Sequence, residues 1–209
     1  MRGGVQAIDC AVVGAGPAGL AASVALAGRG VDHVVLERDR VAGTWRAQRW
    51  DSFRLNTAGW MNAMFGDQER YAYAPGGEVI ERLERIAAGC PVREGVRVAR
   101  LAPAGDGWVL TTDDGELRAG AVIVATGDQN LPRVPALAGR LPGRVAQLHA
   151  ADYRSPAQLP EGAVLVVGSA QSGCQIAEDL LAGGRRVVVA TCPAGRLPSG
   201  TGAATSSNG

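Results

Sequence analysis

A glycine-rich hexapeptide near the start of the chain has the clearest chemical meaning. Residues 14–19 read Gly-Ala-Gly-Pro-Ala-Gly and directly follow a short apolar run, Ala7 to Val13. In such a GxGxxG loop the first glycine allows a tight turn, the second lets a pyrophosphate approach, and the third lets a helix pack on a strand. Free N–H groups at the start of the following helix attract phosphate. Gly14, Gly16 and Gly19 are therefore predicted to bind a dinucleotide.

A carboxylate stands where this kind of site needs one. Glu37 closes a second apolar run, Val31 to Glu37. An acidic residue about 20 positions beyond the glycine loop can bind the ribose hydroxyls of the dinucleotide. A glycine-rich loop without a ligand would leave Glu37 unexplained.

The pattern recurs late in the chain, where residues 168–173 read Gly-Ser-Ala-Gln-Ser-Gly. Ala170 replaces the middle glycine and adds a methyl group where the pyrophosphate would approach. This second copy predicts another dinucleotide site, whose candidate residues are Gly168, Ser169, Gln171, Ser172 and Gly173.

The second copy differs from the first at the acidic position, which is occupied by Thr191. No carboxylate is present there to repel a 2′-phosphate, and an arginine can accommodate that group. Arg185, Arg186 and Arg196 lie nearby in the sequence. We therefore expect this site to prefer NADP to NAD, with a solvated arginine surface as the alternative.

The elements that must position these residues follow from the apolar pattern. Helices are predicted over Pro17 to Gly28, Glu78 to Ala88 and Gln171 to Leu181, and residues 38–77 show no clear period. Further strands are predicted over Val96 to Leu101, Trp108 to Thr112, Glu116 to Arg118, Ala121 to Ala125, Ala163 to Val167 and Arg186 to Ala190. The strand–helix–strand order at both ends predicts an α/β fold with parallel sheets.

Composition excludes several classes of protein. The net charge is +1, from 21 basic residues that are all arginine and 20 acidic residues. Nucleic-acid binding and lysine-dependent chemistry are therefore not expected. Four scattered cysteines and two isolated histidines provide no metal site. Without an apolar run long enough for a membrane, we expect a soluble, cytoplasmic protein.

In their combined order, these motifs resemble those of the flavin-containing monooxygenases (class B flavoprotein monooxygenases). The resemblance includes the two fingerprints, residues 125–127 (Ala-Thr-Gly) and residues 43–46 (Gly-Thr-Trp-Arg). It implies that the first fingerprint binds FAD, together with Glu37 and Arg38, and that the second binds NADPH. Trp45 and Arg46 would lie near the flavin, and Thr126 and Gly127 would close over the cofactor.

Two further residues enter through the resemblance. Asn56 resembles the family asparagine that hydrogen-bonds the oxygenated flavin, although it could equally be a turn residue. His149 and Tyr153 have the spacing of the end of the family's linker motif, whereas Gly143 and Val145 replace its phenylalanine and glycine. His149 is expected either to couple domains or to cap a surface turn.

The resemblance implies a Rossmann-type, three-layer FAD-binding domain over residues 1–150, without its C-terminal return segment. Residues 151–198 would form an incomplete second Rossmann-type NAD(P)-binding unit, and residues 199–209 a disordered tail.

The implied reaction transfers hydride from NADPH to FAD, and the reduced flavin then forms a C4a-(hydro)peroxide with O2 that oxygenates a small organic substrate. Two alternatives stay open: an NAD(P)H:acceptor oxidoreductase without oxygenation, and a truncated or degenerate non-catalytic FAD-binding fragment. Disulfide reduction is disfavoured, because no two cysteines stand together beside the first fingerprint.

Overall fold

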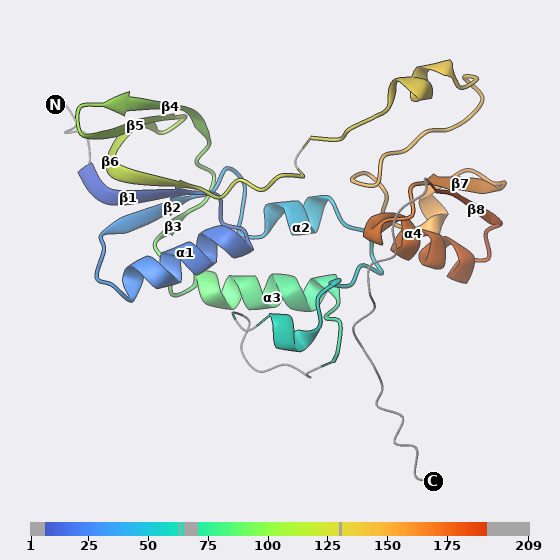
Figure 1. Ribbon diagram of the computed structural model, residues 1–209, viewed down its shortest axis with the longest axis horizontal. Coiled ribbons are helices and arrows are strands. Elements are labelled where there is room, and N and C mark those ends of the chain that lie inside the picture. The colour runs from blue at the N-terminus through green and yellow to red at the C-terminus, as the bar shows by residue number, and fades with distance from the viewer. Residues whose placement is uncertain (1–6, 63, 65–70, 130, 192–209) are drawn as a thin grey trace, which may run out of the picture. The chain divides into compact units, whose positions relative to one another are not determined.

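The computed structural model describes residues 7–62, 64, 71–129 and 131–191. The chain forms two compact units, Met1–Pro160 and Glu161–Gly209, and Figure 1 shows the elements of each. Arg196 and the expected tail at 199–209 lie outside the described residues.

The first unit holds six strands and three α-helices among its described residues. The strands are β1 (Ala7–Val13), β2 (His33–Leu36), β3 (Val92–Arg93), β4 (Val98–Ala104), β5 (Gly107–Thr112) and β6 (Gly115–Val124). The helices are α1 (Pro17–Ala27), α2 (Gly43–Ala47) and α3 (Gly76–Ala87), with short 3₁₀ helices at Gly59–Met61, Ala136–Arg140 and Pro156–Gln158.

The six strands form one sheet in the order β3-β2-β1-β6-β5-β4. Strands β3, β2, β1 and β6 pair with one another in parallel, and β6, β5 and β4 form an antiparallel meander. A β-strand points alternate side chains to opposite faces, so the sheet has two cores. Val12 and Val35 pack with residues of α1 and α3, whereas Ala11 and Val34 pack with Leu110 of the meander. This three-layer order confirms the predicted Rossmann-type α/β fold.

The sequence prediction is wrong about the last strands of this unit. It places two strands at residues 116–118 and 121–125, whereas the structure has the single strand β6. Ala119 and Gly120 lack the large or β-branched side chains by which a strand is identified in a sequence. Only small residues fit at these positions, because Ala119 is buried and a Cβ on Gly120 would lie 3.1 Å from the backbone oxygen of Asp9.

Two short elements escape the sequence prediction. Helix α2 has five residues and β3 has two, so neither is long enough to show a hydrophobic period. Residues 38–77, where no period was found, therefore contain a helix that begins after Ala42, whose φ is 59°.

The second unit repeats the opening strand–helix–strand pattern. Its described elements are β7 (Val164–Val167), α4 (Gln171–Ala182) and β8 (Val187–Ala190), and the two strands are parallel. Val166 of β7 is buried with Ile176 and Leu180 of α4, while Leu165 and Val167 on the other face are exposed. Helix α4 therefore covers one face of this small sheet.

A buried polar pair joins α1 to β2. The Nδ1 atom of His33 lies 2.9 Å from the carbonyl oxygen of Val31, and its Nε2 lies 2.8 Å from the hydroxyl oxygen of Ser23. A carbonyl can only accept, so Nδ1 carries the proton and Nε2 accepts from Ser23 in the neutral ring. The pair satisfies the two buried polar side chains of this layer, Ser23 and His33.

Removing the Ser23 hydroxyl is expected to destabilise the fold. Ser23→Ala leaves the buried Nε2 of His33 without a donor, which costs about 1–3 kcal/mol of unfolding free energy. Urea denaturation followed by circular dichroism measures this loss. Ser52→Ala, at an exposed turn residue, should change stability by less than about 0.5 kcal/mol. Equal stability of the two variants would contradict the assigned role of the pair.

Candidate dinucleotide-binding sites

The first glycine loop is shaped by backbone contacts that only glycine permits. Gly14 has φ of 107°, and its N–H donates to the carbonyl of Leu36 over 2.8 Å. A Cβ on Gly14 would lie 2.5 Å from the carbonyl oxygen of Ala125, and one on Gly19 would lie 1.8 Å from that of Gly14. These contacts hold the ends of β1, β2 and β6 together at the start of α1.

The middle glycine of the loop has a different role. A Cβ on Gly16 would meet nothing within 4 Å, so no protein atom explains the absence of a side chain there. Gly16 is also the N-cap of α1, and no side chain caps this helix terminus. Open space beside free helical N–H groups matches what a pyrophosphate requires.

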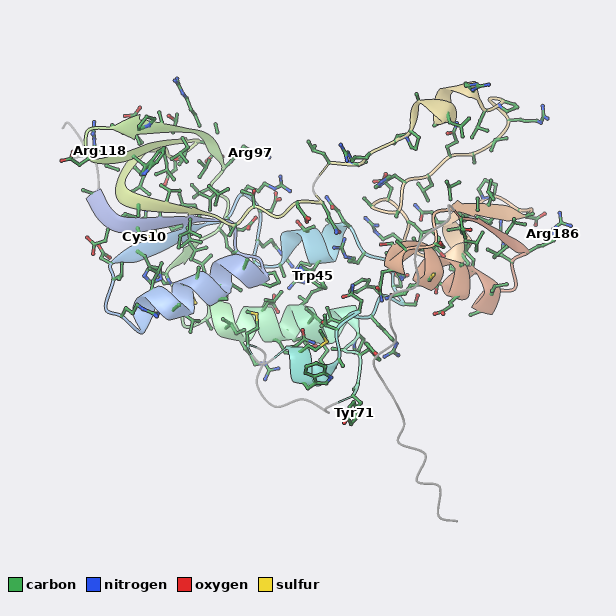
Figure 2. The ribbon with its side chains drawn as sticks, in the orientation of Figure 1. Cys10, Trp45, Tyr71, Arg97, Arg118 and Arg186 are labelled. Carbon is green, nitrogen blue, oxygen red and sulfur yellow. The ribbon has the colours of Figure 1, made fainter. Side chains whose placement is uncertain are left out.

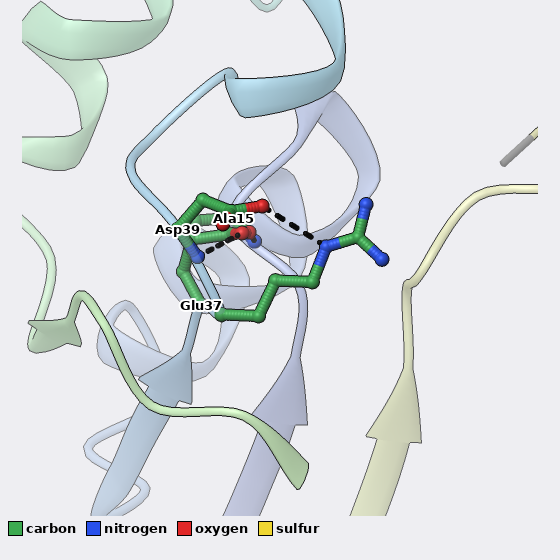
Figure 3. Close-up of polar contacts among 4 residues, drawn as sticks. Ala15, Glu37 and Asp39 are labelled. Carbon is green, nitrogen blue, oxygen red and sulfur yellow. Dashed lines mark hydrogen bonds and ion pairs between the residues drawn. The ribbon is translucent and has the colours of Figure 1, made fainter. Parts of the chain in front are cut away.

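Figure 3 shows the Glu37 carboxylate at the mouth of this loop. One oxygen accepts from the N–H of Ala15 over 2.8 Å, and the other accepts from the N–H of Asp39 over 3.1 Å. These two bonds fix the carboxylate, and each oxygen keeps acceptor capacity for a hydroxyl group. The side chain of Arg38 is exposed to solvent, and its Nε forms an ion pair with the carboxylate of Asp39 over 3.1 Å.

The residues expected near a flavin come from three segments. The Cα atom of Thr126 lies 3.4 Å from where a Cβ on Gly14 would be, so β6 ends against the glycine loop. Gly127 follows with φ of 79°, and both residues are exposed. The side chain of Arg46 pairs with Glu84 of α3, which ties α2 to α3. Asn56 is exposed and follows the buried Leu55.

Trp45 lies on the side of α2 that faces α3, as Figure 2 shows. It packs against the core and meets the ring of Phe53 edge-on, with 5.6 Å between ring centres. Phe53 in turn meets the ring of Trp50 edge-on at 5.1 Å. Three aromatic residues of the segment without a sequence period therefore pack together, whereas Trp60, Tyr71 and Tyr73 of the same segment are exposed.

The second glycine loop reproduces the backbone geometry of the first. Gly168 has φ of 103°, its N–H donates to Ala190 over 2.9 Å, and a Cβ on Gly173 would lie 1.9 Å from the Gly168 oxygen. Ala190 thus matches Leu36, and Thr191 stands at the position of Glu37. The remaining candidates, Ser169, Gln171 and Ser172, are exposed around the start of α4.

The structure corrects the expectation for two arginines of this unit. The N–H of Val164 at the start of β7 donates to the carbonyl of Arg186, so Arg186 and its neighbour Arg185 lie at the start of the sheet. The glycine loop lies at the other end of both strands, about 13 Å away at a strand rise near 3.3 Å per residue. Parallel strands bind ligands at their carboxyl ends, so neither arginine reaches the loop from the backbone position it holds.

Arg154 is a residue that sequence reasoning missed. Its guanidinium donates to the carbonyl oxygens of Ala47, Ala151 and Tyr153, and its own carbonyl accepts from the N–H of Asp51 over 2.9 Å. These bonds attach the segment before Pro160 to the end of α2. An arginine between two turn segments carries no sequence signal of such a role.

His149 makes a local contact of the kind that the turn-capping alternative requires. Its Nδ1 accepts from the N–H of Ala151 over 3.1 Å, which closes a local turn before the buried Tyr153.

The cysteines show no redox pair within the described part of the chain. Cys10 is buried, Cys90 is half-buried and Cys174 is exposed, and all three are free thiols. Burial, with a smaller contribution from Asp9, raises the pKa of Cys10 and keeps it protonated. Among the described residues no group of three potential metal ligands gathers. No helix described here is both long and apolar enough to cross a membrane.

The two glycine loops, the fixed carboxylate and the sheet order define a dinucleotide-binding α/β protein. The sequence matches the pyridine nucleotide-disulphide oxidoreductase family over residues 11–198, and the chain belongs to this family.

Relatives of the chain include a monooxygenase and an oxidoreductase. The indole-3-pyruvate monooxygenase YUCCA1 of Oryza sativa is 36% identical, over 81% of this chain and 44% of its own length. A CzcO-like oxidoreductase of Geobacillus kaustophilus is 34% identical, over 83% of this chain and 51% of its own. The chain thus spans about half the length of these relatives.

A solved structure has the same fold. The flavin-containing monooxygenase from Stenotrophomonas maltophilia superposes with a TM-score of 0.78 at 28% identity, over 90% of this chain and 58% of that one.

Alanine at Gly19 and at Gly16 should separate a structural role from a ligand role. Gly19→Ala places a methyl 1.8 Å from a backbone oxygen and should cost more than about 3 kcal/mol of unfolding free energy. Gly16→Ala meets no protein atom and should cost no more than about 1 kcal/mol, the scale of an N-cap change. Chemical denaturation of both variants measures this, and equal losses would contradict the loop geometry described above.

Proposed function

We propose that the chain is the nucleotide-binding part of an FAD-dependent, NADPH-using oxidoreductase. The observation that carries the proposal is the open space at Gly16 beside the fixed carboxylate of Glu37. A dinucleotide satisfies both at once, since its pyrophosphate takes the helix terminus and its ribose hydroxyls donate to the carboxylate. FAD is assigned here because the similar solved structure is a flavin-containing monooxygenase.

The other expected residues are assigned by their places in the fold. Thr126 and Gly127 follow β6 where it meets the glycine loop and would line the cofactor, while Trp45, Arg46 and Asn56 come from the segment that follows β2. When bound, the flavin supplies redox chemistry and activates oxygen. The residues of this chain hold and orient it and keep water from its faces.

The second loop, with Gly168, Gly173 and Thr191, is proposed as the NADPH site. Its support is the same backbone turn as in the first loop, with no carboxylate at the position of Glu37. Arg196 is the proposed partner of the 2′-phosphate. We further propose oxygen transfer to a small organic substrate, because the similar proteins include the rice indole-3-pyruvate monooxygenase and the Stenotrophomonas flavin-containing monooxygenase. The free thiols suit a cytoplasmic location.

The purified chain is expected to bind FAD and to turn yellow. Its visible spectrum should show bound flavin, which NADPH bleaches under anaerobic conditions faster than NADH does. Readmission of O2 should restore the oxidised spectrum. A colourless protein that added FAD does not reconstitute would favour the alternative of a non-catalytic fragment.

A matched variant makes this experiment specific to the proposed site. Gly16→Ala should fold but bind FAD at least about tenfold more weakly, because its methyl group takes space needed by the pyrophosphate. Wild-type FAD affinity in this variant would place the flavin elsewhere.

A carboxylate at the end of β8 should weaken the preference for NADPH. Thr191→Glu restores the acid that the first copy has in Glu37, and its charge repels a 2′-phosphate. The ratio of NADPH to NADH reduction rates should fall by about tenfold, equivalent to about 1.4 kcal/mol. Arg186→Ala, at the opposite end of the sheet, should leave the ratio unchanged. If Arg186→Ala loses the preference for NADPH and Thr191→Glu keeps it, the assignment of the second loop as the NADPH site is wrong.

A further inference from the structure

Arg49 is a half-buried cation held by aromatic rings. Its guanidinium carbon lies 5.4 Å from the ring centres of both Trp45 and Phe53, and its Nη1 donates to the carbonyl of Gln48 over 2.9 Å. The two rings attract the cation through their electron-rich faces. Arg49 is therefore held in one place by its surroundings rather than by a carboxylate.

The charge of Arg49 is not balanced within the described part of the chain. The ion pairs found there join Arg38 to Asp39, Arg46 to Glu84 and Arg82 to Glu78. Arg49 has no such partner, and burial lowers its pKa. A guanidinium has five N–H donors and no acceptor, so most of its hydrogen-bonding capacity remains available to an anion.

A second donor without an acceptor belongs to the same cluster. Trp50 is 4% exposed, and its indole N–H is buried without a hydrogen-bond partner among the described residues. Leaving such a group unsatisfied costs about 1–3 kcal/mol. Trp50 and Arg49 both contact the ring of Phe53, so a buried N–H without an acceptor and a guanidinium without a carboxylate partner belong to one aromatic cluster.

We propose that Arg49 and the indole N–H of Trp50 recognise the carboxylate of an organic acid, whose hydrocarbon part packs beside Trp45 and Phe53. In terms of the proposed function, on which this step rests, the substrate class is an aryl or alkyl carboxylic acid. A nucleotide phosphate offers the same oxyanion chemistry. The carboxylate is favoured because the pyrophosphate already has the helix terminus at Gly16 and because the rings suit an apolar group.

The test uses the purified chain without added flavin. Phenylacetate and phenylacetamide have the same shape, and only the first carries a charge. Titration of each is followed by the indole N–H signals of the ¹⁵N-labelled protein. Phenylacetate should shift the signals of Trp45 and Trp50 and leave that of Trp108 on β5 unchanged. Phenylacetamide should bind about tenfold more weakly, the effect of losing a charged hydrogen bond.

Three variants assign the preference to Arg49. Arg49→Met should bind the acid and the amide equally, whereas Arg49→Lys should keep part of the preference because it keeps the charge. Arg100→Met, at an exposed site on β4, removes the same charge and should behave as the wild type. If Arg49→Met does not fold, two other results still test the proposal. These are the affinities of the wild type for the acid and the amide, and the same two affinities of Arg49→Lys. Equal binding of acid and amide by the wild type overturns the proposal.

Separate titrations with FAD and inorganic phosphate distinguish the sources of the anion. If Arg49→Met loses affinity for either while the wild type binds acid and amide alike, the site serves a nucleotide phosphate and the carboxylate proposal falls. If the wild type prefers the acid but binds no FAD, the carboxylate site stands and the proposed function falls.

Discussion

The structure depends on a backbone contact between the first and last glycines of each fingerprint. In the first loop, Gly19 approaches the carbonyl of Gly14 so closely that no Cβ fits between them. This contact sets the start of α1 against the end of β1 and directs the helix N-terminus to the edge where the strands end. Gly173 and Gly168 make the same contact in the second unit. One packing constraint therefore builds both candidate sites.

The two sites differ in what surrounds that contact. A Cβ on Gly14 would collide with Ala125 at the end of β6, whereas one on Gly168 would meet nothing within 4 Å. The first loop thus lies between β2 and β6, with Glu37 fixed by backbone N–H groups. The described second sheet contains β7 and β8. The FAD proposal accordingly rests on a more complete set of contacts than the NADPH proposal.

Much of this arrangement could be predicted from the sequence. Apolar runs ending at glycine located β1, α1, β7 and α4, because local steric requirements determine each boundary. The same reasoning failed where geometry depends on distant residues. The continuity of β6 through Ala119 and Gly120 reflects packing against β1 and β5. Arg186 is a different case, because it begins a strand that the sequence itself predicts and strand direction then places it away from the glycine loop. Arg49 and Arg154 have no sequence signal, since their roles arise from tertiary contacts.

The central claim is that Glu37 and the glycine loop together bind a flavin dinucleotide. The FAD dissociation constant of Glu37→Gln, measured against the wild type, tests it most directly. An amide keeps the size of the side chain but loses its charge and one acceptor, so affinity should fall by about tenfold or more. FAD affinity unchanged by Glu37→Gln would contradict the claim.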